Sequence, residues 1–143
     1  MAKIKEMIGF DPNMVHSERI DVQMQKWNGY KKALIFNRFG SVQVDLMDRP
    51  TKFNDSNRTY TAYIHSLWVN EKARKNGLAT RLMDAAEKLA KDTYNKEVYL
   101  EWNLKESPQW VEDWYFRRGY DDVEFGAGCA LMVKKLIGEE GVK

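Results

Sequence analysis

The chain has 143 residues, of which 43% are hydrophobic and 31% charged, and its formal net charge is +2. This length and composition are typical of one globular domain, so we expect a single domain over residues 1–143. No apolar run approaches the roughly 18 residues that cross a membrane, and the first ten residues lack the apolar segment of a signal peptide. One cysteine excludes an internal disulfide, and two histidines argue against a zinc site. We therefore expect a cytoplasmic protein without a metal, membrane or nucleic-acid partner.

Strand patterns dominate the first half of the chain. Polar and apolar side chains alternate in its first segment, which indicates a half-buried strand. Asn28-Gly29 is a strong hairpin signal, because both residues tolerate a positive φ angle. The expected elements of this half are strands over residues 18–25, 33–39, 41–47 and 59–69, with a polar loop over residues 49–58.

The spacing of apolar residues changes from two to the helical period after Gly77. Leu78 and Leu82 begin an apolar face, and charged residues fall on the other faces. This pattern predicts an amphipathic helix that ends at Asn95. The apolar residues 97–103 that follow predict a buried strand.

A second helix and two strands close the chain. Ser107-Pro108 indicates a helix start, with Ser107 as the N-cap and Pro108 in the first helical position, and Gly119 marks the end of that helix. Two strands are then expected over residues 120–125 and 129–136. Together these elements predict an α/β (α+β) fold with a mixed, largely antiparallel sheet flanked by helices.

The turn between strand 59–69 and the first helix carries the clearest chemical pattern. The first N–H groups of a helix have no partner within the helix, and the helix dipole makes that end positive. Gly77 and Ala79 allow a diphosphate to approach the backbone there, and Arg74 and Lys75 add positive charge. Neither the P-loop nor the dinucleotide glycine pattern is present. The alternative is a simple strand-to-helix turn in which Gly77 only supplies an unusual dihedral angle.

The spacing Arg74-x-x-Gly77-x-Ala79, preceded by Leu67-x-Val69, resembles the acetyl-CoA signature of the GNAT acetyltransferase superfamily. The resemblance covers roughly residues 59–136. It implies a GNAT-like sheet with a V-shaped splay between the fourth and fifth strands, and pantetheine lying in the gap. The residues that it implies for acetyl-CoA binding are Leu67, Trp68, Val69, Arg74, Lys75, Asn76, Gly77, Leu78, Ala79 and Thr80.

Tyr115 is the candidate general acid. Residues 115–120, Tyr-Phe-Arg-Arg-Gly-Tyr, resemble the Phe-Tyr-x-x-x-Gly-Phe element of the family, in which the tyrosine often protonates the departing thiolate. A phenol has a suitable pKa for this step. The alternative is a core aromatic that pairs with Val111 one helical turn earlier. Pro108 stands where the family tends to carry asparagine, and it has no N–H to donate.

His65 and Glu101 are the candidate general bases. The amine must be neutral to attack, and histidine has the one unperturbed pKa suited to this near neutral pH. Residues 65–69, His-Ser-Leu-Trp-Val, look like the His-x-Leu-x-Val of arylalkylamine N-acetyltransferases, in which this histidine serves in proton removal. Strand alternation places His65 on one face with Tyr63, Leu67 and Val69. The alternatives are a structural histidine and a Glu101 that faces solvent.

The acceptor is the least defined part of the prediction. Family members usually have two helices between the first and second strands, but Asn28-Gly29 predicts a direct connection, so these helices are lacking or shortened. An open site suits a protein N-terminus or a lysine side chain, whereas an aromatic-lined site suits a small amine. The candidates to line it are the loop over residues 49–58, Trp27, Tyr30, Trp68 and Trp102.

The resemblance thus implies an N-acetyltransferase that moves the acetyl group of acetyl-CoA to a primary amine by direct transfer in a ternary complex, with no metal. Both a monomer and a homodimer are compatible with the sequence. The main alternative is a non-catalytic CoA-binding or sensing module. A nucleic-acid-binding domain that uses Lys72, Arg74, Lys75 and Arg81 is disfavoured, because the remaining charge is balanced.

Overall fold

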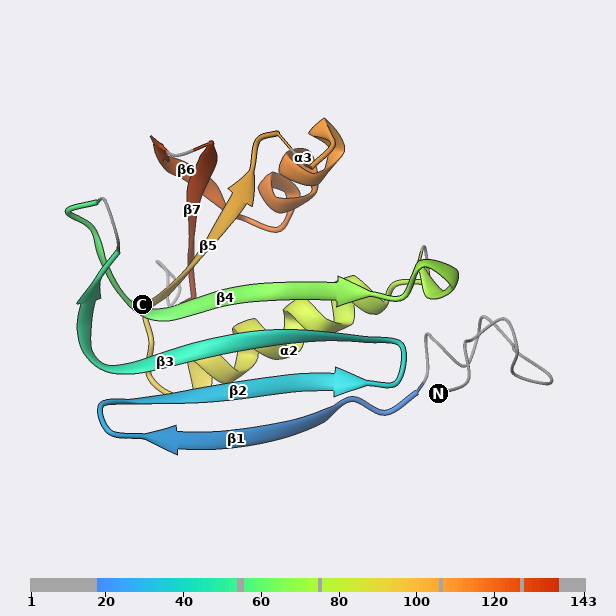
Figure 1. The fold of residues 1–143 in the computed structure, drawn as a ribbon, viewed down its shortest axis with the longest axis horizontal. Coiled ribbons are helices and arrows are strands. Elements are labelled where there is room, and N and C mark those ends of the chain that lie inside the picture. Colours follow the sequence, from blue (N-terminus) through green and yellow to red (C-terminus); the bar gives the residue numbers. More distant parts are fainter. Residues whose placement is uncertain (1–17, 54–55, 75, 106, 127, 137–143) are drawn as a thin grey trace, which may run out of the picture.

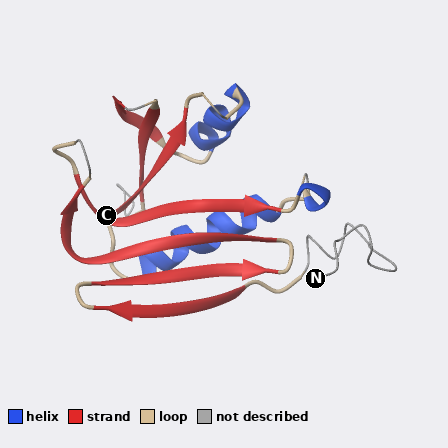
Figure 2. Cartoon of the chain, in the orientation of Figure 1, coloured by secondary structure: helices blue, strands red, loops and turns tan. Residues whose placement is uncertain are grey.

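A mixed sheet and two helices form the framework of the protein (Figures 1 and 2). The computed structural model describes residues 18–53, 56–74, 76–105, 107–126 and 128–136. Within them, seven strands form one sheet in the order β1-β2-β3-β4-β5-β7-β6. The elements are β1 (Asp21–Trp27), β2 (Tyr30–Asn37), β3 (Gly40–Lys52), β4 (Thr59–Val69), the 3₁₀ turn η2 (Glu71–Ala73), α2 (Leu78–Asp92), β5 (Glu97–Asn103), α3 (Gln109–Arg117), β6 (Asp121–Gly126) and β7 (Cys129–Lys135).

β1 and β2 form the predicted hairpin. Trp27 pairs with Tyr30 across the two-residue turn, and Gly29 in that turn has a φ angle of 93°. No helix separates these two strands, which confirms that the usual pair of helices is missing at this point. The first 17 residues lie outside the described part of the chain.

β3 is longer than the sequence pattern predicts. It continues to Lys52 through Pro50, so the loop expected over residues 49–58 begins later. The pairing of β3 with β4 is interrupted between Leu46 and Thr51. Pro50 falls in this interruption, where no N–H is needed for the sheet, and this explains why a proline is tolerated within the strand.

β4 and β5 are parallel neighbours that separate from each other. They pair in register at one position, where Tyr63 lies opposite Tyr99. Beyond this pair the strands diverge, and β5 runs away from β4 toward α3 (Figure 1). The predicted splay between the fourth and fifth strands is therefore confirmed. Both strands have the bounds expected from the sequence, residues 59–69 and 97–103.

α2 covers one face of the sheet and supplies much of the core (Figure 2). Leu78, Leu82 and Met83 are at most 1% exposed. Each fully buried leucine stabilises the fold by roughly 2 kcal/mol. Gly40 of β3 admits this close packing, because a Cβ atom there would lie 2.7 Å from the carbonyl oxygen of Trp68 and 3.2 Å from the Leu78 side chain. The start of α2 is thereby held against the ends of β3 and β4.

Both helices begin or end a few residues from the predicted positions. α2 ends at Asp92 rather than Asn95, because Tyr94 takes a left-handed conformation with a φ angle of 69°. Pro108 is the N-cap of α3 and not its first helical residue, with an extended ψ angle of 155°. The expected capping by Ser107 is therefore wrong. α3 itself ends at Arg117, and Gly119 follows with a φ angle of 99°.

Candidate functional site

The gap between β4 and β5 contains a cavity of about 480 Å³. Three elements line it, so residues that are far apart in the sequence meet there. His65 comes from β4, Glu101 from β5 and Tyr115 from α3. The other lining residues are Ile64, Ser66, Leu67, Leu100, Trp102, Asn103, Ser107 and Val111. The structure therefore brings together the three residues that the sequence singled out for acid–base chemistry.

A β-bulge at Ser66 changes the faces on which the residues of β4 lie. His65 pairs with Gln43 and Trp68 with Ser41, so three residues of β4 span the distance of two on β3. The extra residue is accommodated because Ser66 takes a positive φ angle of 59°. Residues directly opposite each other in a sheet point to the same face.

The bulge makes one expectation wrong. Val69 lies opposite the buried Gly40 and packs against the core, as Leu67 does, whereas His65 lies on the other face. Trp68 shares the face of His65 and is 51% exposed. The strict alternation that grouped His65 with Leu67 and Val69 fails because it assumed a strand without a bulge.

His65 is held by hydrogen bonds at both ring nitrogens. Its Nε2 lies 3.1 Å from Oδ1 of Asp45 on β3, and its Nδ1 lies 2.8 Å from Oγ of Ser66. The ring also stacks on Tyr63, with 5.3 Å between centroids. Lys32 of β2 lies 3.7 Å from the same Asp45 oxygen. This histidine is thus fixed in position at the edge of the cavity, with its side chain 21% exposed.

Glu101 accepts a hydrogen bond of 2.8 Å from the hydroxyl of Tyr63 across the gap. Burial, and then the hydrogen bond and negative charge of Glu101, raise the pKa of Tyr63 well above its usual range. The phenol therefore stays protonated and keeps donating to Glu101. Glu101 is exposed, as the solvent-facing alternative expected, but it also contacts β4 and lines the cavity.

Tyr115 approaches the cavity from the helix side. Burial raises the pKa of its phenol, and the positive charge of Arg118 opposes this shift. The ring contacts Trp114 and meets Tyr120 edge-on at 5.7 Å. Val111, the neighbour expected one helical turn earlier, lines the same cavity. Tyr115 can therefore pack beside Val111 and still reach the gap.

The turn before α2 has the features expected of a diphosphate site. Gly77 is the N-cap of α2 with a φ angle of 79°, and no side chain caps the helix among the described residues. The N–H groups of the first turn, including that of Ala79, are therefore available to a ligand. Arg74 is exposed, and its Nε donates to the carbonyl oxygen of Val69 at 3.1 Å.

The remaining residues of this turn contribute in different ways. The Leu78 side chain is buried in the core, so this residue has only its main-chain N–H to offer. Thr80 is exposed in the first turn of α2. Asn76 donates to the carbonyl oxygens of Ala73 and Arg74, which stabilises the turn. Lys75 lies outside the described residues.

A second cavity of about 430 Å³ shares Glu101 with the first. Aromatic rings form one of its walls, with Phe53 and Tyr60 in contact at 4.4 Å between centroids and tilted by 34°. The expected contribution of the loop after β3 is found in part. The lining residues are Lys52, Phe53, Ser56, Tyr60, Tyr63, Glu101, Glu124, Phe125, Gly126, Cys129 and Leu131.

The tryptophans and Tyr30 proposed for the acceptor site are distributed differently from expectation. Trp27 and Tyr30 stack on each other at 5.2 Å by the β1–β2 turn and line neither cavity. Trp68 does not line them either, whereas Trp102 lines the first and is 5% exposed.

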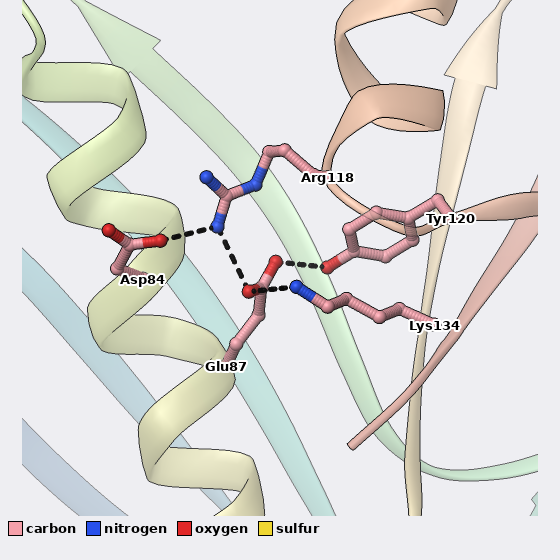
Figure 3. A network of polar contacts seen from close by, with 5 residues as sticks. All are labelled: Asp84, Glu87, Arg118, Tyr120 and Lys134. Atoms are coloured by element: carbon pink, nitrogen blue, oxygen red, sulfur yellow. Dashed lines mark hydrogen bonds and ion pairs between the residues drawn. The ribbon is translucent and has the colours of Figure 1, made fainter. Parts of the chain in front are cut away.

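A largely buried ionic cluster joins α2 to the C-terminal part of the chain (Figure 3). Oε1 of Glu87 accepts from Arg118 at 2.9 Å and from Lys134 at 2.8 Å, and Oε2 accepts from the hydroxyl of Tyr120 at 2.8 Å. Arg118 also donates to Asp84 at 2.8 Å. We call these five residues the Glu87 cluster. It connects α2 to the end of α3, the helix that carries Tyr115.

A family model described as the acetyltransferase (GNAT) family matches residues 39–120, which is more than half of the chain. The chain belongs to the GNAT acetyltransferase family. The matched region runs from the start of β3 to Tyr120. It therefore includes β4 and β5, which line both cavities, and the turn before α2. A search among curated proteins found no match.

Solved structures share the fold at low sequence identity. A Pyrococcus horikoshii protein is 17% identical with a TM-score of 0.56, over 76% of this chain and 65% of its own. A PaiA N-acetyltransferase from Thermoplasma acidophilum, solved with coenzyme A, is 15% identical with a TM-score of 0.55, over 75% and 61%. A GNAT acetyltransferase from Elizabethkingia anophelis with acetyl-CoA bound is 12% identical with a TM-score of 0.57, over 83% and 99%. The chain thus spans less than two thirds of the first and second of these relatives.

Asp45, Ser66 and Tyr63 belong to the site, but the sequence did not single them out. Asp45 is 20 residues from His65, and only the β3–β4 register brings the two together. Ser66 is adjacent to His65 in the sequence, and this adjacency could have suggested a contact between them. The contact itself depends on the bulge. Within the described residues, no helix is long and apolar enough to cross a membrane, and no group of three or more His, Cys, Asp or Glu forms a metal site.

Proposed function

We propose that this single-domain chain is a cytoplasmic N-acetyltransferase that moves the acetyl group of acetyl-CoA directly to a primary amine in a ternary complex. The observation that supports it most is the shared cavity of His65, Glu101 and Tyr115 in the gap between β4 and β5. Membership of the GNAT family and the uncapped start of α2 support the same conclusion. No metal takes part in the proposal.

The cofactor-binding role rests on the turn before α2 and the end of β4. We propose that the main-chain N–H groups from Arg74 to Thr80, Lys75 included, hold the pyrophosphate and that the Arg74 side chain adds charge. The pantetheine arm then lies in the gap. The end of β4, residues 67–69, faces it, and a main-chain N–H group of Leu67 or Val69 donates to the thioester carbonyl.

The acid and the base face the gap from opposite elements. Tyr115 is suited to protonate the leaving thiolate, because burial raises the pKa of the phenol and keeps its proton in place. His65 is better placed than Glu101 to accept the proton of the amine. Glu101 is exposed on β5, whereas Asp45 orients the His65 ring and its charge can stabilise the imidazolium that forms.

The second cavity is our candidate for the acceptor site. It shares Glu101 with the first cavity, and Glu124 adds a second carboxylate to its wall. Carboxylates and aromatic faces both attract an ammonium group. We therefore propose a small amine with an apolar stem as the acceptor, in preference to a protein N-terminus or a lysine side chain.

Calorimetric titration with acetyl-CoA tests the cofactor site. The wild type should bind saturably, and a folded Arg74→Glu/Gly77→Asp variant should lose binding, because its carboxylates repel the pyrophosphate. Lys91→Glu, a charge reversal at the other end of α2, is the control and should bind like the wild type. An absence of binding at millimolar acetyl-CoA contradicts the proposal.

A screen of amines then tests turnover. Transfer to at least one amine is expected, and Tyr115→Phe and His65→Ala should lower its rate roughly 10²-fold each. Binding of acetyl-CoA without transfer to any amine would instead support the non-catalytic CoA-binding module.

A further inference from the structure

The hydrogen bonds of His65 determine which nitrogen can take a proton. The carboxylate of Asp45 can only accept hydrogen bonds, so the Nε2 atom that faces it at 3.1 Å carries the hydrogen. In a neutral imidazole the other nitrogen is then an acceptor. This Nδ1 faces Oγ of Ser66 at 2.8 Å, so the serine hydroxyl donates to it. His65 is therefore poised to receive a proton at Nδ1, and its partner there is Ser66.

Ser66 has an unusual backbone conformation that places its hydroxyl at this point. Its φ angle is 59°, which costs a non-glycine residue of order 1 kcal/mol. The bulge lets His65 and Ser66, which are neighbours in sequence, line the same cavity. Ser66 is exposed, whereas His65 is more enclosed by Asp45 and Tyr63. The hydroxyl is thus the exposed end of a chain of hydrogen bonds that runs inward to Asp45.

We propose that Ser66 is a catalytic proton relay, which takes the proton from the acceptor amine and passes its own hydroxyl proton to Nδ1 of His65. Asp45 is the positioning residue of this relay. It holds the ring in the tautomer that leaves Nδ1 free to accept, and its charge stabilises the imidazolium that forms. The inference rests on the proposed function, because it assigns the path of the proton in that reaction.

The step balances without a further reactant. The amine nitrogen forms a bond to the thioester carbonyl carbon, and the carbon–sulfur bond breaks. One amine proton moves to Oγ of Ser66, while the Ser66 proton moves to Nδ1 of His65. The thiolate receives a proton from Tyr115, and release of the His65 proton to solvent and reprotonation of Tyr115 restore the starting state. Ser66 forms no bond to the acetyl group at any stage.

The direct test replaces Ser66 with glycine. Glycine removes the hydroxyl and adopts a positive φ angle without strain, so the fold should be retained. Ser41→Ala is the matched control, because Ser41 lies on β3 opposite Trp68 and lines neither cavity. With an alkylamine acceptor at neutral pH, Ser66→Gly should lower kcat roughly 10²-fold with little change in the KM for acetyl-CoA. Ser41→Ala should match the wild type.

A second acceptor separates proton removal from a general loss of the site. Hydroxylamine is mostly neutral at pH 7 and less dependent on a base, so its transfer should fall far less in Ser66→Gly than that of the alkylamine. An equal loss for both acceptors indicates a merely structural role and overturns the relay. The relay is also overturned if the kcat of Ser66→Gly for the alkylamine stays within about threefold of the wild type. In that case, the rate of His65→Ala still shows whether His65 acts directly as the base.

Two physical measurements complete the test. Nitrogen NMR of the imidazoles should show His65 with its hydrogen on Nε2, and only His16 has to be told apart from it. A neutral ring with the hydrogen on Nδ1 contradicts the relay. Mass spectrometry after incubation with acetyl-CoA alone should find no acetyl group on Ser66, and an acetyl-serine would overturn the inference in favour of a covalent intermediate. Lack of transfer by the wild type to any amine overturns the proposed function, and the relay falls with it.

Discussion

The protein contains two side-chain networks centred on a carboxylate, and they differ in how completely their charges are paired. In the Glu87 cluster the carboxylate is 9% exposed, and each oxygen accepts a hydrogen bond, with two cations and a phenol as donors. In the relay, Asp45 is 20% exposed and contacts His65 and, at 3.7 Å, Lys32.

The difference separates a stabilising network from a reactive one. The Glu87 cluster lies between α2, the end of α3 and β7, where burial makes an unpaired charge costly (Figure 3). Both oxygens of Glu87 are accordingly engaged, although the buried Nε of Arg118 has no hydrogen-bond partner among the described residues. Burial lowers the pKa of Arg118, but its hydrogen bond to Asp84 and the charge of Glu87 outweigh this and raise it. The relay instead ends at an exposed hydroxyl beside a cavity, so a proton can enter and leave. We expect substitutions in the Glu87 cluster to lower stability more than activity, and substitutions in the relay to lower activity more than stability.

The largest effect is expected from Glu87→Ala. This change leaves Arg118 and Lys134 without their shared partner in a buried position, which should lower the free energy of unfolding by about 3–5 kcal/mol. Urea denaturation followed by circular dichroism measures it. Lys88→Ala is the matched control, because its pair with Asp92 is exposed on the same helix, and it should change stability by less than about 0.5 kcal/mol. A loss below about 1 kcal/mol for Glu87→Ala contradicts the structural role of the cluster.

Asp45→Asn should produce the opposite pattern. An amide can donate to Nε2 of His65, which allows the tautomer with its hydrogen on Nδ1 and removes the proton acceptor that faces Ser66. We expect kcat for an alkylamine to fall roughly 10-fold to 100-fold while the fold is retained. Steady-state kinetics and a thermal melt measure the two quantities. Asp48→Asn, an exposed change on the same strand, should leave both unaltered, and equal rates for the two variants would contradict the positioning role.

Tyr120→Phe tests the contribution of the Glu87 cluster to the pH dependence of stability. Burial, and then the charge of Glu87, raise the pKa of Tyr120 above its ordinary value near 10. The folded state therefore holds this proton more tightly than the unfolded chain. The resulting stability is fully present below about pH 10 and is lost as the pH rises above it.

The Tyr120→Phe variant should lose about 1.5 kcal/mol near neutral pH, because Glu87 loses a hydrogen bond. It should also show a weaker decline of stability between about pH 8 and about pH 11 than the wild type. Urea denaturation at the two pH values measures this. An unchanged decline would show that the other tyrosines determine the alkaline behaviour.

The smallest effect on stability is expected from Ser66→Gly. Relief of the positive φ angle and the greater entropy of the unfolded chain act in opposite directions, so the free energy of unfolding should change by less than about 1 kcal/mol. Ser66→Ala, which keeps the unfavourable conformation, should be less stable than Ser66→Gly. The reverse order would mean that the bulge does not impose the conformation of Ser66 in solution.

Much of the fold was predictable because its signals are local. The bounds of β4 and β5, the Asn28-Gly29 hairpin and the turn before α2 follow from alternation, turn chemistry and helical period within a few residues. The family was predictable from the spacing of Arg74, Gly77 and Ala79. The length of β3 and the start of α3 were predicted wrongly, because Pro50 and Pro108 were assigned by general preference, whereas pairing with neighbouring strands and the local backbone decided their places.

The sequence by itself determined the order of the elements, the turn at Gly77 before α2 and three residues suited to acid–base chemistry. Only the tertiary structure decided that His65, Glu101 and Tyr115 face one cavity, that Asp45 orients His65, and that Glu87 is surrounded by partners from other elements. The physical reason is that the cavity residues come from separate elements and that the hydrogen bonds of Asp45 and Glu87 join residues 20 or more positions apart. Such contacts depend on strand register, and a single bulge at Ser66 is enough to move side chains from one face of the sheet to the other.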